Sequence, residues 1–168
     1  NYQRNPANFD QVYKNMLKLE NNPKIKLKGW LAYTITPLNV FHFVEFMKWK
    51  LVDSNLIKFN SLTAPRPIVT HHMCHSPKHY NIKVLPIEIK LMIKEHYMKY
   101  IEWALNSDLP DRVKQDFVKI SNGVIKFMMS EDYSKDHLSK FISVTNGLDK
   151  IRNQNILDIV PQYEKLFT

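Results

Sequence analysis

Glycine, cysteine and long apolar runs are all scarce in this chain. Three glycines in 168 residues leave no GxxxxGK or GxGxxG motif, so a glycine-rich phosphate-binding loop is excluded. The single cysteine, Cys74, excludes an internal disulfide and is compatible with a reducing compartment, so we expect a cytoplasmic location. No apolar run approaches the roughly 20 residues that a membrane-spanning helix requires.

Basic residues outnumber acidic ones, and the formal net charge is +8. Such an excess is common in proteins that bind nucleic acid, because lysine and arginine release counterions from phosphates. Here the lysines are spread along the chain among acidic residues, and only Lys24, Lys26 and Lys28 form a row on one face of an expected strand. A solvated face is the favoured interpretation, and nucleic acid stays an alternative partner.

The pattern of apolar residues predicts an α/β fold with a helical second half. Residues 24–35 read as a strand covered on both faces, and from Val40 the spacing changes to that of an amphipathic helix. Residues 55–62 and 80–85 read as further strands, which we expect to be parallel. A helix begins after Asn8, and everything from Pro86 onward reads as helix, so we expect two regions, 1–85 and 86–168.

Polar residues follow the expected strands at their carboxyl ends, where ligands of parallel sheets bind. Thr34, Thr36 and Asn39 follow the first strand, and Asn60 lies at the end of the second. An asparagine at such a position either contacts a ligand or closes a turn with its own side chain, and the turn is the favoured interpretation for each asparagine taken singly.

A histidine-rich stretch lies between the expected second and third strands. His71, His72, Cys74 and His75 offer nitrogen and sulfur atoms that suit zinc. Adjacent residues of an extended chain point in opposite directions, so the four cannot all converge, and we predict no metal site. The favoured interpretation is a polar loop that contributes His71 and His72 to a pocket. Cys74 as a nucleophile is a further alternative, which needs a base and an oxyanion hole.

Four segments, in this order, resemble the radical S-adenosylmethionine enzymes, and in particular the subgroup called twitch-domain proteins. The first resembles the stretch after the fourth strand of that family's barrel, and the second resembles the fifth strand and its helix. The third resembles the sixth-strand region, and the fourth resembles the subgroup's C-terminal end. The segments are YQRNPANFDQVYKNMLKL, TITPLNVFHFVEFMKW, IKFNSLTAPRPIVTHHM with YNIKVLPIEIK, and FISVTNGLDKIRNQNILDIVPQYEKLF.

The resemblance implies a fold, two cofactors and candidate site residues. It implies a partial (β/α) barrel with parallel strands over residues 1–85, followed by a mainly helical cap. It also implies S-adenosylmethionine and a 4Fe–4S cluster held by a CxxxCxxC motif, which this chain lacks. Asn39, Arg4 and Thr36 are then the expected contacts of the cofactor. Asn60, His71 and His72 are those of the substrate pocket.

The first hypothesis is therefore that this chain is the C-terminal part of a radical S-adenosylmethionine enzyme, inactive alone. Its missing N-terminal half or a partner subunit would hold the cluster, and the substrate would be a small molecule or a peptide. The parent enzyme would form a 5′-deoxyadenosyl radical that abstracts hydrogen. The alternatives are a non-enzymatic basic module that binds nucleic acid or a protein, and a metal-dependent enzyme that uses His71, His72, Cys74 or His75.

Overall fold

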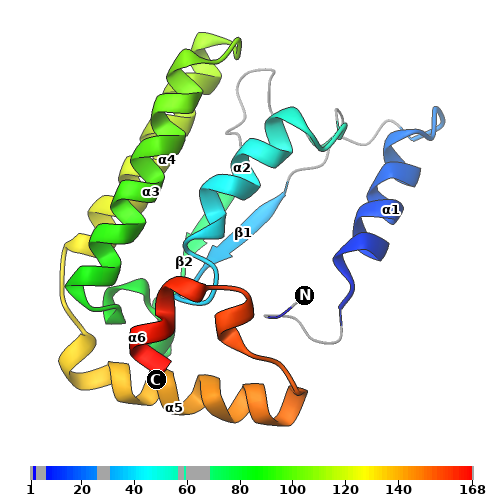
Figure 1. Ribbon diagram of the computed structural model, residues 1–168. Coiled ribbons are helices and arrows are strands. Elements are labelled where there is room, and N and C mark those ends of the chain that lie inside the picture. Colours follow the sequence, from blue (N-terminus) through cyan, green and yellow to red (C-terminus); the bar gives the residue numbers. More distant parts are fainter. Residues whose placement is uncertain (1, 3–6, 26–30, 57–58, 60–68, 168) are drawn as a thin grey trace.

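The structure is a computed structural model that describes residues 2, 7–25, 31–56, 59 and 69–167 (Figure 1). Helices make up 67% of these residues, and only two short strands occur among them. The prediction of an α/β partial barrel is therefore wrong: the described part of the chain is mostly a bundle of helices beside a two-stranded sheet. The predicted division between residues 85 and 86 stays a prediction.

The sheet contains β1 (Ala32–Ile35) and β2 (Thr70–Met73), which are parallel and joined through α2 (His42–Val52). Their parallel pairing agrees with the strand–helix–strand unit expected from the sequence, but the partner strand differs. Residues 55 and 56 are not in a strand, and residue 59 lies in a turn. The remainder of the predicted 55–62 strand is outside the described residues. The sequence instead assigned β2 to a polar loop.

The strand predicted at residues 80–85 is also wrong. Two 3-10 helices, η2 (Lys78–Tyr80) and η3 (Ile82–Val84), occupy this stretch. Asn81 lies between them, and its Oδ1 accepts a hydrogen bond from the backbone N–H of Lys83 at 3.0 Å. This local bond favours a turn over an extended strand. The apolar residues Ile82, Val84 and Leu85 are buried nonetheless. The apolar pattern therefore predicted their burial correctly and their backbone conformation incorrectly.

The helices of the second half confirm the sequence prediction. α3 (Ile87–Asn106) and α4 (Asp111–Met129) lie side by side as a long pair, and α5 (Ser134–Arg152) lies along one end of the molecule (Figure 1). Pro86 and Pro110 immediately precede α3 and α4, where a missing N–H costs least. The C-terminal segment, residues 156–167, contains η4 (Ile156–Asp158), η5 (Pro161–Tyr163) and α6 (Glu164–Phe167).

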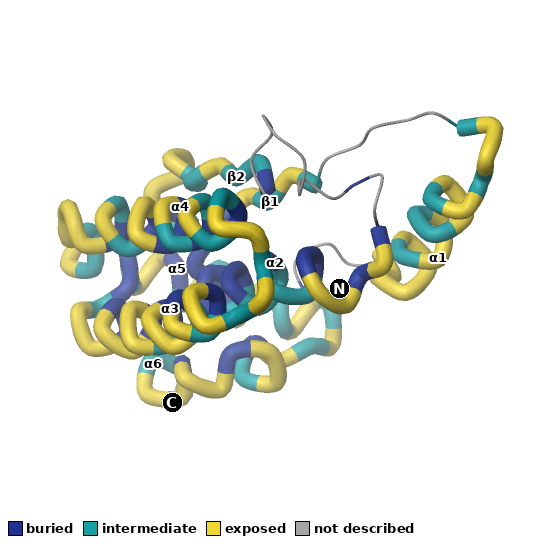
Figure 2. The backbone as a smooth tube through the Cα atoms, turned by 90° about the horizontal axis from the view of Figure 1, so that it is seen from above, coloured by how far each residue is buried: buried dark blue, intermediate teal, exposed yellow. Residues whose placement is uncertain are grey.

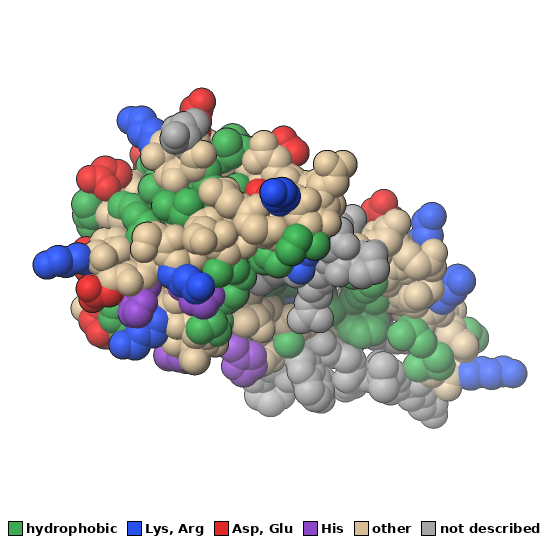
Figure 3. All heavy atoms as spheres, turned by 90° about the horizontal axis from the view of Figure 1, so that it is seen from below, with side chains coloured by type: hydrophobic (Ala, Val, Ile, Leu, Met, Phe, Trp, Pro, Cys, Tyr) green, Lys and Arg blue, Asp and Glu red, His purple; other side chains and the backbone are tan. Residues whose placement is uncertain are grey.

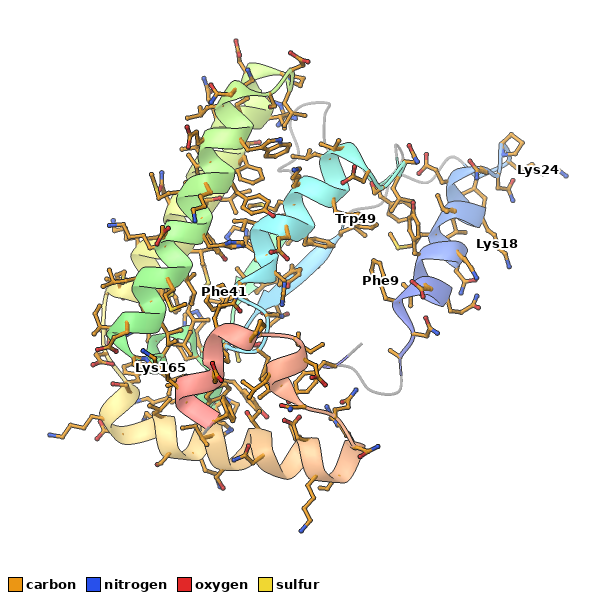
Figure 4. The ribbon with its side chains drawn as sticks, in the orientation of Figure 1. Phe9, Lys18, Lys24, Phe41, Trp49 and Lys165 are labelled. Carbon is orange, nitrogen blue, oxygen red and sulfur yellow. The ribbon has the colours of Figure 1, made fainter. Side chains whose placement is uncertain are left out.

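The first helix, α1 (Phe9–Glu20), lies at the margin of the molecule (Figures 1 and 2). Asn8 caps it as predicted, because its side chain accepts hydrogen bonds from the N–H groups of Asp10 and Gln11. No residue of α1 is buried. The rings of Phe9 and Tyr13 each meet Trp49 of α2 edge-on at 5.5 Å, and Figure 4 shows Phe9 and Trp49 pointing toward each other.

Buried residues come from most of the chain (Figure 2). One cluster of buried side chains runs from Ile35 and α2 through α3 and α4 to Val160 and Tyr163. The predicted stripe on the second helix is confirmed, since Val40, Phe43, Val44 and Met47 are all fully buried. Buried apolar area of this kind supplies most of the stability of a small domain.

Three tyrosine hydroxyls hold the turn between β1 and α2, here called the central turn (residues 36–41). Tyr163 donates to the carbonyl of Pro37 at 2.6 Å, and Tyr97 of α3 donates to that of Val40 at 2.8 Å. Tyr33 of β1 donates to the carbonyl of Asn39 at 3.2 Å. Because buried carbonyls must find donors, these bonds tie β1, α3 and the C-terminal segment to one turn.

We expect Tyr163→Phe to lower the free energy of unfolding by about 1–3 kcal/mol, because the buried carbonyl of Pro37 loses its donor. Urea denaturation measures the change. Tyr100→Phe on α3 is the matched control, since the Tyr100 hydroxyl makes no hydrogen bond within the described part of the chain. Equal stabilities for the two variants would contradict the role given to the Tyr163 hydroxyl.

Candidate functional site

One face of the two-stranded sheet is covered by a helix, and the other face is largely exposed. The rings of Tyr33 and His71 both contact Phe43 of α2, at centroid distances of 5.0 and 5.7 Å, so α2 covers this face. The register pairs Thr34 with His72 on the opposite face. We call Ala32, Thr34, Thr70 and His72 the open sheet face, of which all but Thr70 are exposed. The prediction that the first strand is covered on both faces is therefore wrong for residues 32–35.

The carboxyl end of β1 is shaped by Asn39. Its Oδ1 accepts from the backbone N–H of Thr36, and its Nδ2 donates to the carbonyl of Thr34, both at 2.9 Å. Thr36 itself is buried. The geometry thus brings Thr36 and Asn39 together in one turn. It favours the turn-closing interpretation of the Asn39 side chain, which orders the edge of the open sheet face.

The histidine-rich stretch does not converge on one point. His71 lies under α2, His72 is on the open sheet face, and the ring of His75 packs edge-on against Phe127. Cys74 extends the ladder through its N–H, which donates to the carbonyl of Ile35 at 3.0 Å. Within the described ranges, no three or more His, Cys, Asp or Glu side chains are placed to hold a metal ion. Figure 3 shows histidine side chains at several separate points of the visible surface.

Burial lowers the pKa of His71, so this imidazole is neutral near neutral pH. A neutral ring beneath α2 suits packing against Phe43 better than recognition of a charged ligand. His72 is therefore the histidine of the predicted pair that a ligand on the open sheet face can reach. The other predicted site residues, Arg4 and Asn60, lie outside the described residues.

A second polar cluster was missed by the sequence analysis, and we call it the His–Glu–His cluster. The carboxylate of Glu45 on α2 lies between two imidazoles: Oε2 is 2.8 Å from Nδ1 of His42, and Oε1 is 3.2 Å from Nε2 of His96 on α3. The hydrogen bond from His42 lowers the pKa of Glu45 and raises that of His42, against the opposing effect of burial. The spacing of His42 and Glu45 on one helix was the available signal, but their partner is far away in sequence.

Two buried lysines form a third polar feature. Lys83 pairs with the carboxylate of Glu131, and Lys90 donates to the backbone carbonyl of Glu131 at 3.1 Å. A cavity of about 340 Å³ adjoins Lys90 and is lined also by Ile87, Met129, Glu131 and Asp132. Each ammonium group meets an acidic or carbonyl oxygen. The arrangement therefore fastens the connection between α4 and α5 to η3 and α3.

No family model, no curated protein and no solved structure matches this chain. Among the helices of the described residues, none combines the length and the apolar character that crossing a membrane demands.

We expect Asn39→Ala to lower the free energy of unfolding by about 2 kcal/mol, because the N–H of buried Thr36 loses its acceptor. Thermal and urea denaturation measure the change. Asn15→Ala is the control, since it removes only an exposed side-chain hydrogen bond to Gln11 and should cost less than about 0.5 kcal/mol. If Asn39→Ala is as stable as Asn15→Ala, Asn39 does not hold the turn.

Proposed function

We propose that this chain is the C-terminal part of a radical S-adenosylmethionine enzyme and shapes the pocket in which cofactor and substrate meet. The proposal rests on four motifs in family order and on one structural observation. β1 runs into the segment that resembles the family's fifth strand, which begins at Thr34, and β2 lies in the segment that resembles its sixth. The two pair in parallel, as consecutive strands of that family do.

Closing a barrel is not part of this proposal, because the described residues contain two short strands and are mostly helical. What supports a pocket is the open sheet face. Parallel sheets normally have both faces covered, yet here Ala32, Thr34 and His72 are exposed. A covering element from the remainder of the enzyme would place a ligand against these side chains.

The residues of this chain would have distinct tasks in such a pocket. Asn39 fixes the carboxyl edge of β1, next to Thr36, where the resemblance places the S-adenosylmethionine contacts. His72 and Thr34 offer an imidazole and a hydroxyl on the open sheet face for substrate. The cluster would supply the electron that splits S-adenosylmethionine into methionine and the 5′-deoxyadenosyl radical, and its three thiolates would come from outside this chain. A cytoplasmic location belongs to the same proposal.

The test is anaerobic purification of the natural polypeptide that contains this chain. We expect about four iron and four sulfide ions per polypeptide, and 5′-deoxyadenosine after addition of dithionite and S-adenosylmethionine. Iron analysis and mass spectrometry measure the two. The control is the same polypeptide with one cysteine of its CxxxCxxC motif replaced by alanine. Absence of that motif, of iron and of 5′-deoxyadenosine would overturn the proposal.

One observation favours a second candidate, a non-enzymatic module that binds a protein partner. α1 has no buried residue, and the exposed fractions of Phe9 and Val12 are 43% and 48%. Exposed apolar side chains on an amphipathic helix are suited to binding an apolar groove of a partner protein. Nucleic acid is disfavoured as its partner, because the lysines of α1 are accompanied by Asp10 and Glu20. Binding of nucleic acid that weakens steeply with salt would reverse this preference.

A further inference from the structure

We propose that His42 is a pH-dependent clamp that fixes the C-terminal segment, residues 156–167, against the central turn. His42 is the first residue of α2 and lies directly after the turn. Its Nδ1 is 2.8 Å from Oε2 of Glu45, and its Nε2 is 2.9 Å from the backbone carbonyl oxygen of Ile159. The imidazole therefore joins α2 to a residue more than a hundred positions further along the chain.

The hydrogen-bonding partners determine the protonation state that this geometry needs. A carboxylate and a backbone carbonyl only accept hydrogen bonds, so both ring nitrogens must donate. A neutral imidazole has a single N–H and can satisfy one of the two partners. Only the imidazolium cation makes both bonds, and it is also the form that the Glu45 carboxylate stabilises.

Titratable groups from α2, α3 and β1 surround this pair. Oε1 of Glu45 is 3.2 Å from Nε2 of His96, so a second imidazole lies within ion-pair distance of the carboxylate. Three tyrosine hydroxyl groups interact electrostatically with Glu45, and all are neutral in the relevant pH range because the pKa of each is raised by burial. The titratable groups around the clamp are Glu45 on α2, His96, Tyr97 and Tyr100 on α3, and Tyr33 on β1.

The direction of the pH effect follows from the raised pKa of His42. A group with a pKa that is higher in the folded state stabilises that state below its ordinary value. The stabilisation is lost as the pH rises through the raised value. The clamp is therefore closed in mildly acidic solution and opens on the alkaline side of the ordinary histidine range, above about pH 6.5.

Opening the clamp would loosen the C-terminal segment, which packs against the central turn beside the candidate site. Val160 and Tyr163 of this segment are fully buried, and the ring of Tyr163 packs edge-on against that of Phe41 at a centroid distance of 5.9 Å. The same tyrosine holds the carbonyl of Pro37. The clamp thus couples pH to the order of the central turn, which carries Thr36 and Asn39. This inference is independent of the proposed enzymatic function.

Amide hydrogen exchange with mass spectrometry tests the clamp on the unmodified chain. Protection factors, which remove the intrinsic pH dependence of exchange, are compared between about pH 6 and about pH 8.5. We expect the backbone amides of Ile159, Val160, Gln162 and Tyr163 to lose about tenfold in protection at the higher pH, as loss of one charge-assisted bond implies. Amides in the middle of α4 serve as the internal reference and should not change with them.

Two variants make the result specific. His42→Gln should give a profile that is flat with pH, and Glu45→Gln should move the loss of protection to lower pH, because the neutral amide no longer stabilises the cation. His137→Gln on α5 is the matched control and should keep the unaltered profile. A flat profile for the unmodified chain overturns the proposal, as does a profile that His42→Gln leaves unchanged.

Discussion

The fold depends on satisfying the carbonyl groups of the central turn. A turn that is almost wholly buried cannot leave its backbone to water, and hydrogen bonds within the turn cannot reach every carbonyl. Tyr163 of η5 supplies the donor for the carbonyl of Pro37. Tyr33 of β1 and Tyr97 of α3 add a second donor to the carbonyls of Asn39 and Val40, which also accept the backbone N–H groups of His42 and Phe43. Each ring is also large and apolar, so the same side chains fill the core and pair the backbone. The turn is consequently held by side chains from the strand, α3 and the C-terminal segment together.

Reliance on contacts between distant residues explains why sequence patterns predicted the helices well and the sheet poorly. The starts of α1, α3 and α4 are encoded locally, by Asn8, Pro86 and Pro110, and they were found. β2 has no such local code, since Thr70–Met73 carries two histidines and no regular alternation of apolar residues. Its strand conformation comes from pairing with β1, which is a long-range contact. The opposite error at residues 80–85 arose because Asn81 turned a buried apolar stretch into 3-10 helices.

The candidate site was foreseen in part. The position of Asn39 after a strand correctly indicated a side chain that closes the turn, because that role needs only near neighbours. The opposed directions of His71 and His72 follow from the two-residue period of a strand, and the structure bears this out. The His–Glu–His cluster was not foreseen. His96 fitted the apolar face of its helix, and nothing in the sequence says that this face meets Glu45.

Two contacts of the C-terminal segment act on the central turn in different ways. The hydroxyl of Tyr163 is a neutral donor over the whole physiological range, since burial raises its pKa. The imidazole of His42 changes its donor count within that range, because its ordinary pKa already lies there. The C-terminal segment therefore keeps the bond from buried Tyr163 to Pro37 at every pH in this range. Its bond between Ile159 and His42 depends on the protonation of the imidazole. The central turn therefore has a constant attachment at Pro37 and a variable one at His42, and only the variable one can transmit a change of pH to the edge of the sheet.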